Sequence, residues 1–276
     1  MTTNGKPILV ATDLSARSDR AIDRATFLAQ QWGVRLFVLH ALEPGSRLEA
    51  KPELAEQAIR AALPDPEADV GIVPAIGPAP TVIVEAAASA GCGLIVTGVA
   101  RFNHVGDFLI GTAVDHVIRH ATAPVLVVKQ RPHGPYTSIL VATDYSSCSR
   151  QALLTAAALF PDAALHLIHA YHVPYDEGWP RSDDVKQELT REAQEELDAF
   201  VQDPAIPETV RARISARLGY GEPHTVVWDA ADDVGANLVV FGTHGRSGFI
   251  PAVIGSKAET LLRYVPCDTL VVRELS

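Results

Sequence analysis

The segment Asn237-Leu-Val-Val-Phe-Gly242-Thr-His-Gly245-Arg-Ser-Gly248, followed after a short apolar stretch by Gly255-Ser256, decides the fold and the candidate site. Its apolar first part predicts a buried strand, and closely spaced glycines follow at once. Glycines let backbone N–H groups approach a phosphate, and the N-terminus of the next helix adds the positive end of its dipole. The spacing Gly, two residues, Gly, nine residues, Gly-Ser therefore predicts an anion-binding loop.

Two further segments accompany this loop. Ile139-Leu-Val-Ala-Thr-Asp144 is an apolar strand that ends in a carboxylate, and Cys267-Asp-Thr-Leu-Val-Val272 is a closing strand. Together with the glycine loop, these segments resemble the universal stress protein family. The resemblance implies an ATP site in which the glycine loop contacts phosphates and ribose and an Asp lies beside the nucleotide.

The chain carries this pattern twice. Ile8-Leu-Val-Ala-Thr-Asp13 recurs as 139–144, and Pro124-Val-Leu-Val-Val128 matches 268–272. The polar stretch 129–135 between the repeats is rich in Pro and Gly, which is typical of a linker. We therefore predict two tandem domains, 1–134 with a degenerate nucleotide loop and 135–276 with the intact one.

Short apolar strands alternate with helical patterns in both halves, which predicts βαβ units. Near-continuous apolar strands such as Leu238-Val-Val-Phe241 require burial on both faces. The predicted fold class is α/β, with two doubly wound, Rossmann-like parallel sheets of five strands. In such sheets ligands bind beyond the carboxyl ends of the strands, where Asp144 and Gly242 would meet. The expected strands are 7–12, 35–41, 69–74, 93–98 and 124–128, then 138–143, 164–170, 211–217, 237–242 and 268–273.

The resemblance, carried over residue by residue, implies a nucleotide site in the second domain. A carboxylate at Asp144 suits ribose hydroxyls or a bound Mg²⁺ or Mn²⁺, and Ser256 at a helix start suits a phosphate. The backbone at Ala170 would meet the adenine. The alternative is that Asp144 only N-caps a helix at 146–160 and that the glycines serve turns. The implied nucleotide-binding residues are Ala142, Thr143, Asp144, Ala170, Phe241, Gly242, His244, Gly245, Arg246, Gly248, Gly255, Ser256 and Lys257.

The first domain departs from this pattern at Arg101, which stands where the second glycine belongs. A side chain then occupies the place at which backbone would approach phosphate. Asp13, Gly98, Gly111 and Thr112 remain, and Arg101 could pair with a phosphate or fill the site as an internal cation. We predict a degenerate, structural first domain and one nucleotide per chain.

Composition and charge exclude other classes. No apolar run approaches the roughly 20 residues of a membrane span, and the start of the chain lacks a signal-peptide pattern, so we expect a cytoplasmic protein without membrane partners. Residues 1–135 hold 12 Lys/Arg against 13 Asp/Glu, and residues 136–276 hold 11 against 20, which argues against nucleic acid. Much of this acidity lies on an amphipathic helix expected over 182–198, as a solvated face or a docking surface for a basic partner.

Other chemical motifs are missing or misplaced. A P-loop requires Gly-Lys-Ser/Thr, whereas the order here is Gly255-Ser256-Lys257, and no Gly-x-Gly-x-x-Gly follows a first strand. The three cysteines are widely separated, which favours reduced thiols. His166 and His169 are three residues apart and would face opposite sides of a strand, so they do not suit one shared metal ion. A metal at His172 with a neighbouring carboxylate such as Asp176 is the alternative.

Three functional classes follow from these observations. They are an ATP-binding regulator of stress adaptation, a slow ATPase or self-phosphorylating enzyme, and a scaffold for another small ligand. Binding is better supported than turnover, because no nucleophile and base form a recognisable catalytic set in the sequence. Closing strands commonly pair between neighbours in the universal stress protein family, so the resemblance implies that the closing strands of the two domains pair within the chain as a pseudo-dimer. A further homodimer stays open.

Overall fold

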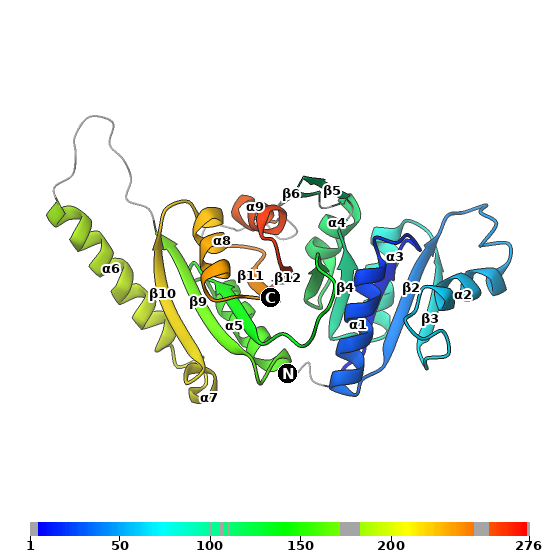
Figure 1. The fold of residues 1–276 in the computed structure, drawn as a ribbon, viewed down its shortest axis with the longest axis horizontal. Coiled ribbons are helices and arrows are strands. Elements are labelled where there is room, and N and C mark those ends of the chain that lie inside the picture. The colour runs from blue at the N-terminus through cyan, green and yellow to red at the C-terminus, as the bar shows by residue number, and fades with distance from the viewer. Residues whose placement is uncertain are drawn as a thin grey trace.

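The computed structural model describes residues 5–99, 101–104, 107–109, 111–171, 183–245 and 254–274. Among the described residues, the two halves of the chain repeat one order of elements, except that the hairpin β5-β6 occurs in the first and the short helix α7 in the second (Figure 1). The first half contains β1 (Ile8–Thr12), α1 (Asp19–Trp32), β2 (Leu36–Leu42), α2 (Pro52–Ala61), β3 (Gly71–Ile76), α3 (Ala79–Ser89), β4 (Leu94–Gly98), β5 (Arg101–His104), β6 (Asp107–Leu109), α4 (Thr112–His120) and β7 (Val125–Val128). The second contains β8 (Ser138–Ala142), α5 (Ser147–Leu159), β9 (Ala164–Tyr171), α6 (Asp183–Val201), α7 (Glu208–Arg211), β10 (Ile214–Tyr220), α8 (Pro223–Asp233), β11 (Leu238–Gly242), α9 (Ser256–Tyr264) and β12 (Asp268–Val272).

The described strands form a ten-stranded sheet in the order β10-β9-β8-β11-β12-β7-β4-β1-β2-β3, beside a small β5-β6 hairpin. Within each half, neighbouring strands of the large sheet are parallel. The strand order reverses between β1 and β4 in the first half and between β8 and β11 in the second. The predicted α/β class with two doubly wound parallel sheets is therefore confirmed, and each reversal marks the place where such sheets bind ligands.

The two sheets join through their closing strands. β12 pairs with β7 in antiparallel register, with Leu270 opposite Leu126, as the resemblance implied. Every residue of both strands is buried. A closing strand without its partner would expose unpaired N–H and C=O groups, so the pairing protects an edge in both halves.

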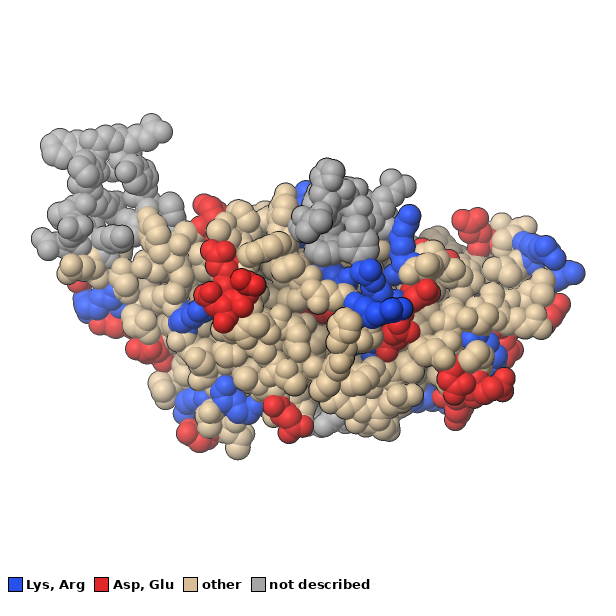
Figure 2. Space-filling model, in the orientation of Figure 1, with Lys and Arg blue, Asp and Glu red and all other residues tan. Residues whose placement is uncertain are grey.

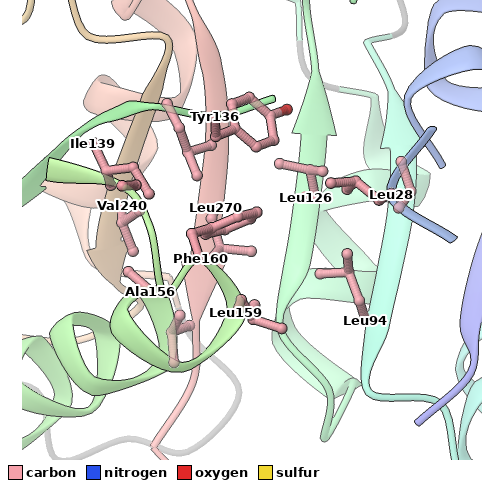
Figure 3. Packing of buried hydrophobic residues seen from close by; sticks show 14 of the residues in the cluster. Leu28, Leu94, Leu126, Tyr136, Ile139, Ala156, Leu159, Phe160, Val240 and Leu270 are labelled. Carbon is pink, nitrogen blue, oxygen red and sulfur yellow. The ribbon is translucent and has the colours of Figure 1, made fainter. Parts of the chain in front are cut away.

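The hydrophobic core runs across this junction. Helices α1, α2, α5 and α6 cover one face of the sheet, and α3, α4, α8 and α9 cover the other, with side chains from both halves in each cluster. Figure 3 shows Leu126 of β7 beside Leu270 of β12, with Phe160 packed nearby. The Trp32 ring of the first half lies 5.7 Å from the Phe160 ring of the second. The two halves consequently bury apolar surface together.

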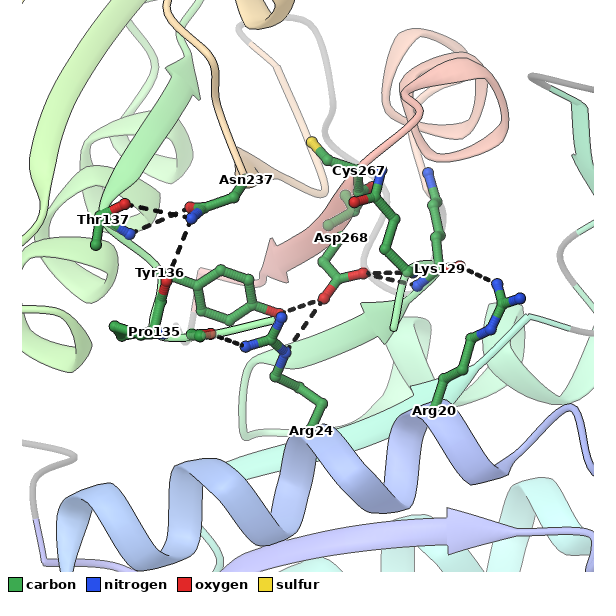
Figure 4. Close-up of polar contacts among 12 residues, drawn as sticks. Arg20, Arg24, Lys129, Pro135, Tyr136, Thr137, Asn237, Cys267 and Asp268 are labelled. Atoms are coloured by element: carbon green, nitrogen blue, oxygen red, sulfur yellow. Dashed lines mark hydrogen bonds and ion pairs between the residues drawn. The ribbon is translucent and has the colours of Figure 1, made fainter. Parts of the chain in front are cut away.

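A buried polar cluster also links the halves (Figure 4). Asp268, only 1% exposed, accepts hydrogen bonds through Oδ1 from the backbone N–H groups of Lys129 at 2.8 Å and Gln130 at 3.0 Å. Its Oδ2 accepts from the Tyr136 hydroxyl and lies 3.5 Å from Nε of Arg24. Because a buried carboxylate needs such partners, Asp268 depends on residues of the first half and the linker.

The structure differs from the sequence prediction at β10, which begins three residues later than expected. The short helix α7 follows Pro207 and occupies the start of the predicted 211–217 strand. Arg211 holds this turn through hydrogen bonds from its guanidinium to the carbonyls of Val201 and Ile206, each at 3.0 Å. The β5-β6 hairpin was not predicted either.

Helix α6 carries the expected acidic face. Leu197 is buried, whereas Glu188 and Glu195 are exposed and pair with Arg191 on the same helix. Over the face of the molecule in Figure 2, acidic side chains lie beside basic ones in both halves. Such interspersed charge is typical of a solvated surface.

Candidate functional site

The candidate site lies at the carboxyl ends of β8 and β11, where the strand order of the second half reverses. The turn after β8 is held by local hydrogen bonds: Thr143 Oγ1 accepts from the N–H of Tyr145 at 3.0 Å and lies 2.9 Å from Ser149 Oγ. Tyr145 has a φ of 64°, in the left-handed region that is uncommon for a residue other than glycine. The turn thereby directs the chain into α5 and leaves Asp144 at the mouth of the crevice.

Asp144 is not the N-cap of the following helix. Ser146 is the N-cap, and its side chain accepts from the N–H of Ser149 at 3.1 Å. Asp144 Oδ1 accepts from the N–H of Ser146 at 3.2 Å and from its hydroxyl at 2.6 Å. The capping alternative for Asp144 is wrong in that form, because its carboxylate positions the cap from outside the helix.

Two glycines of the loop are required by close approach rather than by positive φ. A Cβ at Gly242 would lie 2.6 Å from Sγ of Cys148, and a Cβ at Gly245 would collide with Oδ2 of Asp144. Gly245 therefore brings the loop backbone directly against the carboxylate. A side chain at Gly242 would have to displace α5, and a side chain at Gly245 would have to push the Asp144 carboxylate aside.

Helix α9 begins at Ser256, with Gly255 as its N-cap. The N–H of Gly255 donates to the Thr243 carbonyl at 2.9 Å, which ties the helix start to the loop. Since Gly255 has no side chain, it cannot cap the first-turn amides of α9. These N–H groups and the helix dipole suit an anion at this end of the crevice.

These elements enclose one cavity of about 570 Å³. It brings together eleven of the predicted site residues: Ala142, Thr143, Asp144, Ala170, Phe241, Gly242, His244, Gly245, Gly255, Ser256 and Lys257. Arg246 and Gly248, also predicted, lie outside the described residues, as do His172 and Asp176. The volume falls within the range of ligand pockets in proteins.

The cavity also has walls that the sequence analysis did not identify. Ile168, Val227 and Leu261 supply apolar surface, and Glu196 of α6 reaches its rim. His169 lines it as well: its Nδ1 lies 2.8 Å from the Thr143 carbonyl, and its ring stacks on Tyr145 at 4.2 Å. The side chains of Ile168, Val227, Leu261 and Glu196 have no local signal that separates them from ordinary core or surface residues, whereas His169 lies near the end of β9 at the position that repeats His40.

Two basic side chains line the end of the cavity at which an anion would bind. His244 Nδ1 lies 2.8 Å from Thr243 Oγ1, while its buried Nε2 has no hydrogen-bond partner among the residues that the structure describes. Lys257 pairs with Glu222 at 3.3 Å, but both side chains are exposed, so this ion pair is weak and can rearrange. Together they can meet negative charge at the start of α9.

The equivalent crevice of the first half has the same backbone turn after its first strand, but its cavities are smaller. Leu14 has a φ of 59°, His40 Nδ1 lies 2.9 Å from the Thr12 carbonyl, and Asp13 Oδ1 accepts from Ser15. Burial raises the pKa of Asp13, but the hydrogen bonds from Ser15 outweigh it and the net pKa is lowered. Asp13, Gly98 and Gly111 line a cavity of about 190 Å³, next to a second of about 330 Å³ around Asp13 and His40.

The remaining first-half site residues stand at the edges of this region. Arg101 opens the β5-β6 hairpin, and Thr112 begins α4 as Ser256 begins α9. Within the described part of the chain, no cluster of three or more His, Cys, Asp or Glu side chains is placed to hold a metal ion. None of the helices described there has both the length and the apolar character needed to cross a membrane.

Comparison with known proteins matches the universal stress protein family model to residues 5–129 and 135–273. A protein of Staphylococcus epidermidis named as a universal stress protein is 30% identical over 141 residues, 50% of this chain and 84% of the other. The solved structure of a functionally unknown protein from Pseudomonas aeruginosa aligns with a TM-score of 0.69 at 22% identity, covering 98% of this chain and 93% of the other. A universal stress protein from Archaeoglobus fulgidus aligns with a TM-score of 0.64 at 20% identity, with 98% of both chains covered.

Proposed function

Because the chain belongs to the universal stress protein family, we propose that it is an ATP-binding regulator of stress adaptation whose second half holds the nucleotide. We divide it into a first domain of residues 1–134, with a degenerate site, and a second of residues 135–276. The observation that carries the proposal is that one cavity joins Asp144, the Gly242–Gly245 segment and the N-terminus of α9.

The two ends of this cavity suit the two ends of a nucleotide. Ile168, Val227 and Phe241 form an apolar wall that fits a base. At the other end, Ser256, Lys257 and His244 offer donors and positive charge to phosphates.

Asp144 would stand between base and phosphates. A carboxylate there can accept from ribose hydroxyls or, with the Ser256 hydroxyl, offer the hard oxygen ligands that Mg²⁺ or Mn²⁺ prefers. When bound, the cation would neutralise phosphate charge. The chain's own residues supply the rest of the site, because Gly245 lets the loop backbone come close to both Asp144 and a ligand.

Mass spectrometry of nucleotide released by denaturing the purified protein tests this proposal. We expect about one ATP per chain in the wild type and none in Gly245→Arg, which copies Arg101 of the first half into the second. Gly134→Arg is the matched control, because a Cβ at Gly134 meets nothing within 4 Å. Loss of ATP from both variants, or from neither, would contradict the assignment, provided that melting curves show both variants folded.

One contact favours a second candidate, self-phosphorylation at the same site. Thr243 Oγ1 lies 2.8 Å from His244 Nδ1, so this nitrogen can take the hydroxyl proton as Oγ1 attacks the γ-phosphorus of ATP and the bond to the departing ADP breaks. Intact-mass measurement after incubation with Mg²⁺-ATP would show one added phosphate, absent from Thr243→Val. Stable retention of intact ATP without added mass favours the regulator.

A further inference from the structure

Helix α4 of the first half carries two histidines on one face. His116 and His120 are four residues apart, so their side chains meet on the helix surface, and their rings stack with centroids 4.0 Å apart at an interplanar angle of 25°. Val117 and Ile118 are buried and hold a different side of α4 against the core. The histidine pair therefore faces away from the core, with His120 exposed and His116 half-buried.

The hydrogen bonding of this pair leaves ring nitrogens available to a ligand. His120 Nδ1 lies 2.8 Å from the His116 carbonyl, and because a carbonyl only accepts, this nitrogen carries a proton. In the neutral ring the lone pair is then on Nε2. Histidines that bind metals commonly donate their other ring N–H to a backbone carbonyl, which fixes the tautomer and the ring orientation. The His116 ring makes no hydrogen bond within the described part of the chain.

We propose that His116 and His120 chelate one divalent metal ion of the class that prefers imidazole, namely Cu²⁺, Ni²⁺ or Zn²⁺. Two histidines at this spacing on one helical face are a recurring pair of zinc ligands. The described residues place no third His, Cys, Asp or Glu beside them, so water completes the coordination. Metal–nitrogen distances of about 2.0–2.1 Å bring the two Nε2 atoms closer together than the ring centroids are, and the exposed His120 ring is free to tilt accordingly.

The surroundings of the pair tolerate a cation. Arg119 lies between the two histidines in sequence, but its Nε pairs with Asp115 Oδ2 at 2.8 Å, which offsets its charge. His120 is the last residue of α4, where the negative end of the helix dipole favours cations. Arg273 already uses this end, because its guanidinium donates to the Arg119 carbonyl at 2.9 Å.

The sequence around the pair supports binding rather than hydrolysis. In zinc peptidases a glutamate follows the first histidine of such a pair and acts as the general base. Here Val117 follows His116, and it is buried. The pair therefore offers ligands to a metal without a base beside it.

The pair is not part of the backbone pattern that the two halves share. Helix α9 of the second half matches α4, and Thr260 and Tyr264 stand where His116 and His120 stand in the first. The ring of Tyr264 lies 6.0 Å from that of His224 instead. The metal site belongs to the first half alone, so the inference goes beyond ATP binding in the second half and does not depend on it.

Calorimetric titration of the tag-free chain with Cu²⁺, without added nucleotide, tests the proposal, because Cu²⁺ binds imidazole most tightly among these ions. We expect one site of highest affinity in the wild type. His116→Gln and His120→Gln should each weaken it about 10- to 100-fold, since a single imidazole cannot chelate. His224→Gln is the matched control: it removes an exposed histidine with no histidine four residues away, and it should leave this site unchanged.

The second half allows the same site to be built anew. Thr260→His combined with Tyr264→His should raise the number of high-affinity Cu²⁺ sites from one to two. Electron paramagnetic resonance of the bound Cu²⁺ should show nitrogen coupling in both chains. Mg²⁺ prefers oxygen ligands, so a large excess of it should not displace Cu²⁺ from His116 and His120.

Three results would overturn the inference, provided that melting curves show each variant folded. They are equal Cu²⁺ affinity in the wild type and His120→Gln, an equal loss of affinity in His224→Gln, and no second site in the chain with two added histidines. None of them bears on ATP in the second half, because α4 does not line that cavity.

Discussion

The two crevices of this molecule share a backbone and differ in what they enclose. In each crevice, Thr-Asp at the end of a strand is followed by a residue with positive φ, and a histidine Nδ1 lies within hydrogen-bond distance of the Thr carbonyl. One encloses a single cavity of about 570 Å³, and the other is divided into spaces of about 190 and 330 Å³. Repeated turns therefore fix where a site lies, while a few side chains decide what it can hold.

The halves also differ at the junction, where Asp268 of β12 corresponds to Pro124 before β7. Asp268→Asn should lower the free energy of unfolding by about 3–5 kcal/mol, because it leaves the buried Arg24 guanidinium without its anion. Urea denaturation measures this. Glu208→Gln, which breaks the exposed pair with Arg211, should cost less than about 1 kcal/mol. If the two substitutions cost the same, the junction is not held by Asp268.

The glycines that end β4 and β11, Gly98 and Gly242, offer a sharper comparison. Gly242→Ala should destabilise by about 1–3 kcal/mol, because its Cβ would press on Cys148. Gly98→Ala should cost less, since its Cβ would lie 3.3 Å from the Arg17 carbonyl. Thermal melts of both variants, and of Gly242→Ala combined with Cys148→Ala, measure the difference. Equal costs in the two glycine variants would show that packing against α5 does not explain Gly242. Only partial recovery is expected in the double variant, because the new Cβ would still lie 3.1 Å from the backbone carbonyl carbon of residue 148.

The free energy of unfolding is expected to depend on pH through Lys129 at the junction. Burial lowers the pKa of Lys129 to about 7, although Cys267 and Asp268 act in the opposite direction. Between pH 7 and 9 the unfolded chain then binds more protons at this lysine than the folded one, so its contribution makes stability rise with pH, by at most about 1.4 kcal/mol per unit. Above pH 9 the raised pKa of Cys267 opposes this rise.

Urea midpoints at pH 7 and pH 9 measure this contribution. Lys129→Met, which keeps the buried apolar stem, should flatten the rise with pH. A slope that is the same in both proteins would mean that Lys129 stays charged when the chain folds.

The sequence alone predicted those features whose signal lies within a short segment of the chain. Apolar strands, the Asp at the end of β8, and the spacing of Gly242, Gly245 and Gly255 lie within short segments, so the fold and most of the second-half cavity could be predicted. The start of β10 could not, because Arg211 and its neighbours alternate as a strand does and only their contacts with Val201 and Ile206 reveal a helix.

Residues whose role depends on distant partners were also missed. Val227 and Leu261 are indistinguishable in sequence from any core residue, and they line the cavity only because α8 and α9 pack together. Asp268 reads as an ordinary strand residue until Arg24 and Tyr136 are brought to it from far along the chain.

The most direct test of the account is a calorimetric titration with ATP and Mg²⁺ that determines the number of sites per chain. We expect one site in the wild type, none in Asp144→Ala combined with Gly245→Arg, and one in Asp13→Ala. Two sites per chain, or a single site that is lost in Asp13→Ala and kept in the second-half variant, would contradict the assignment of the nucleotide to the second half.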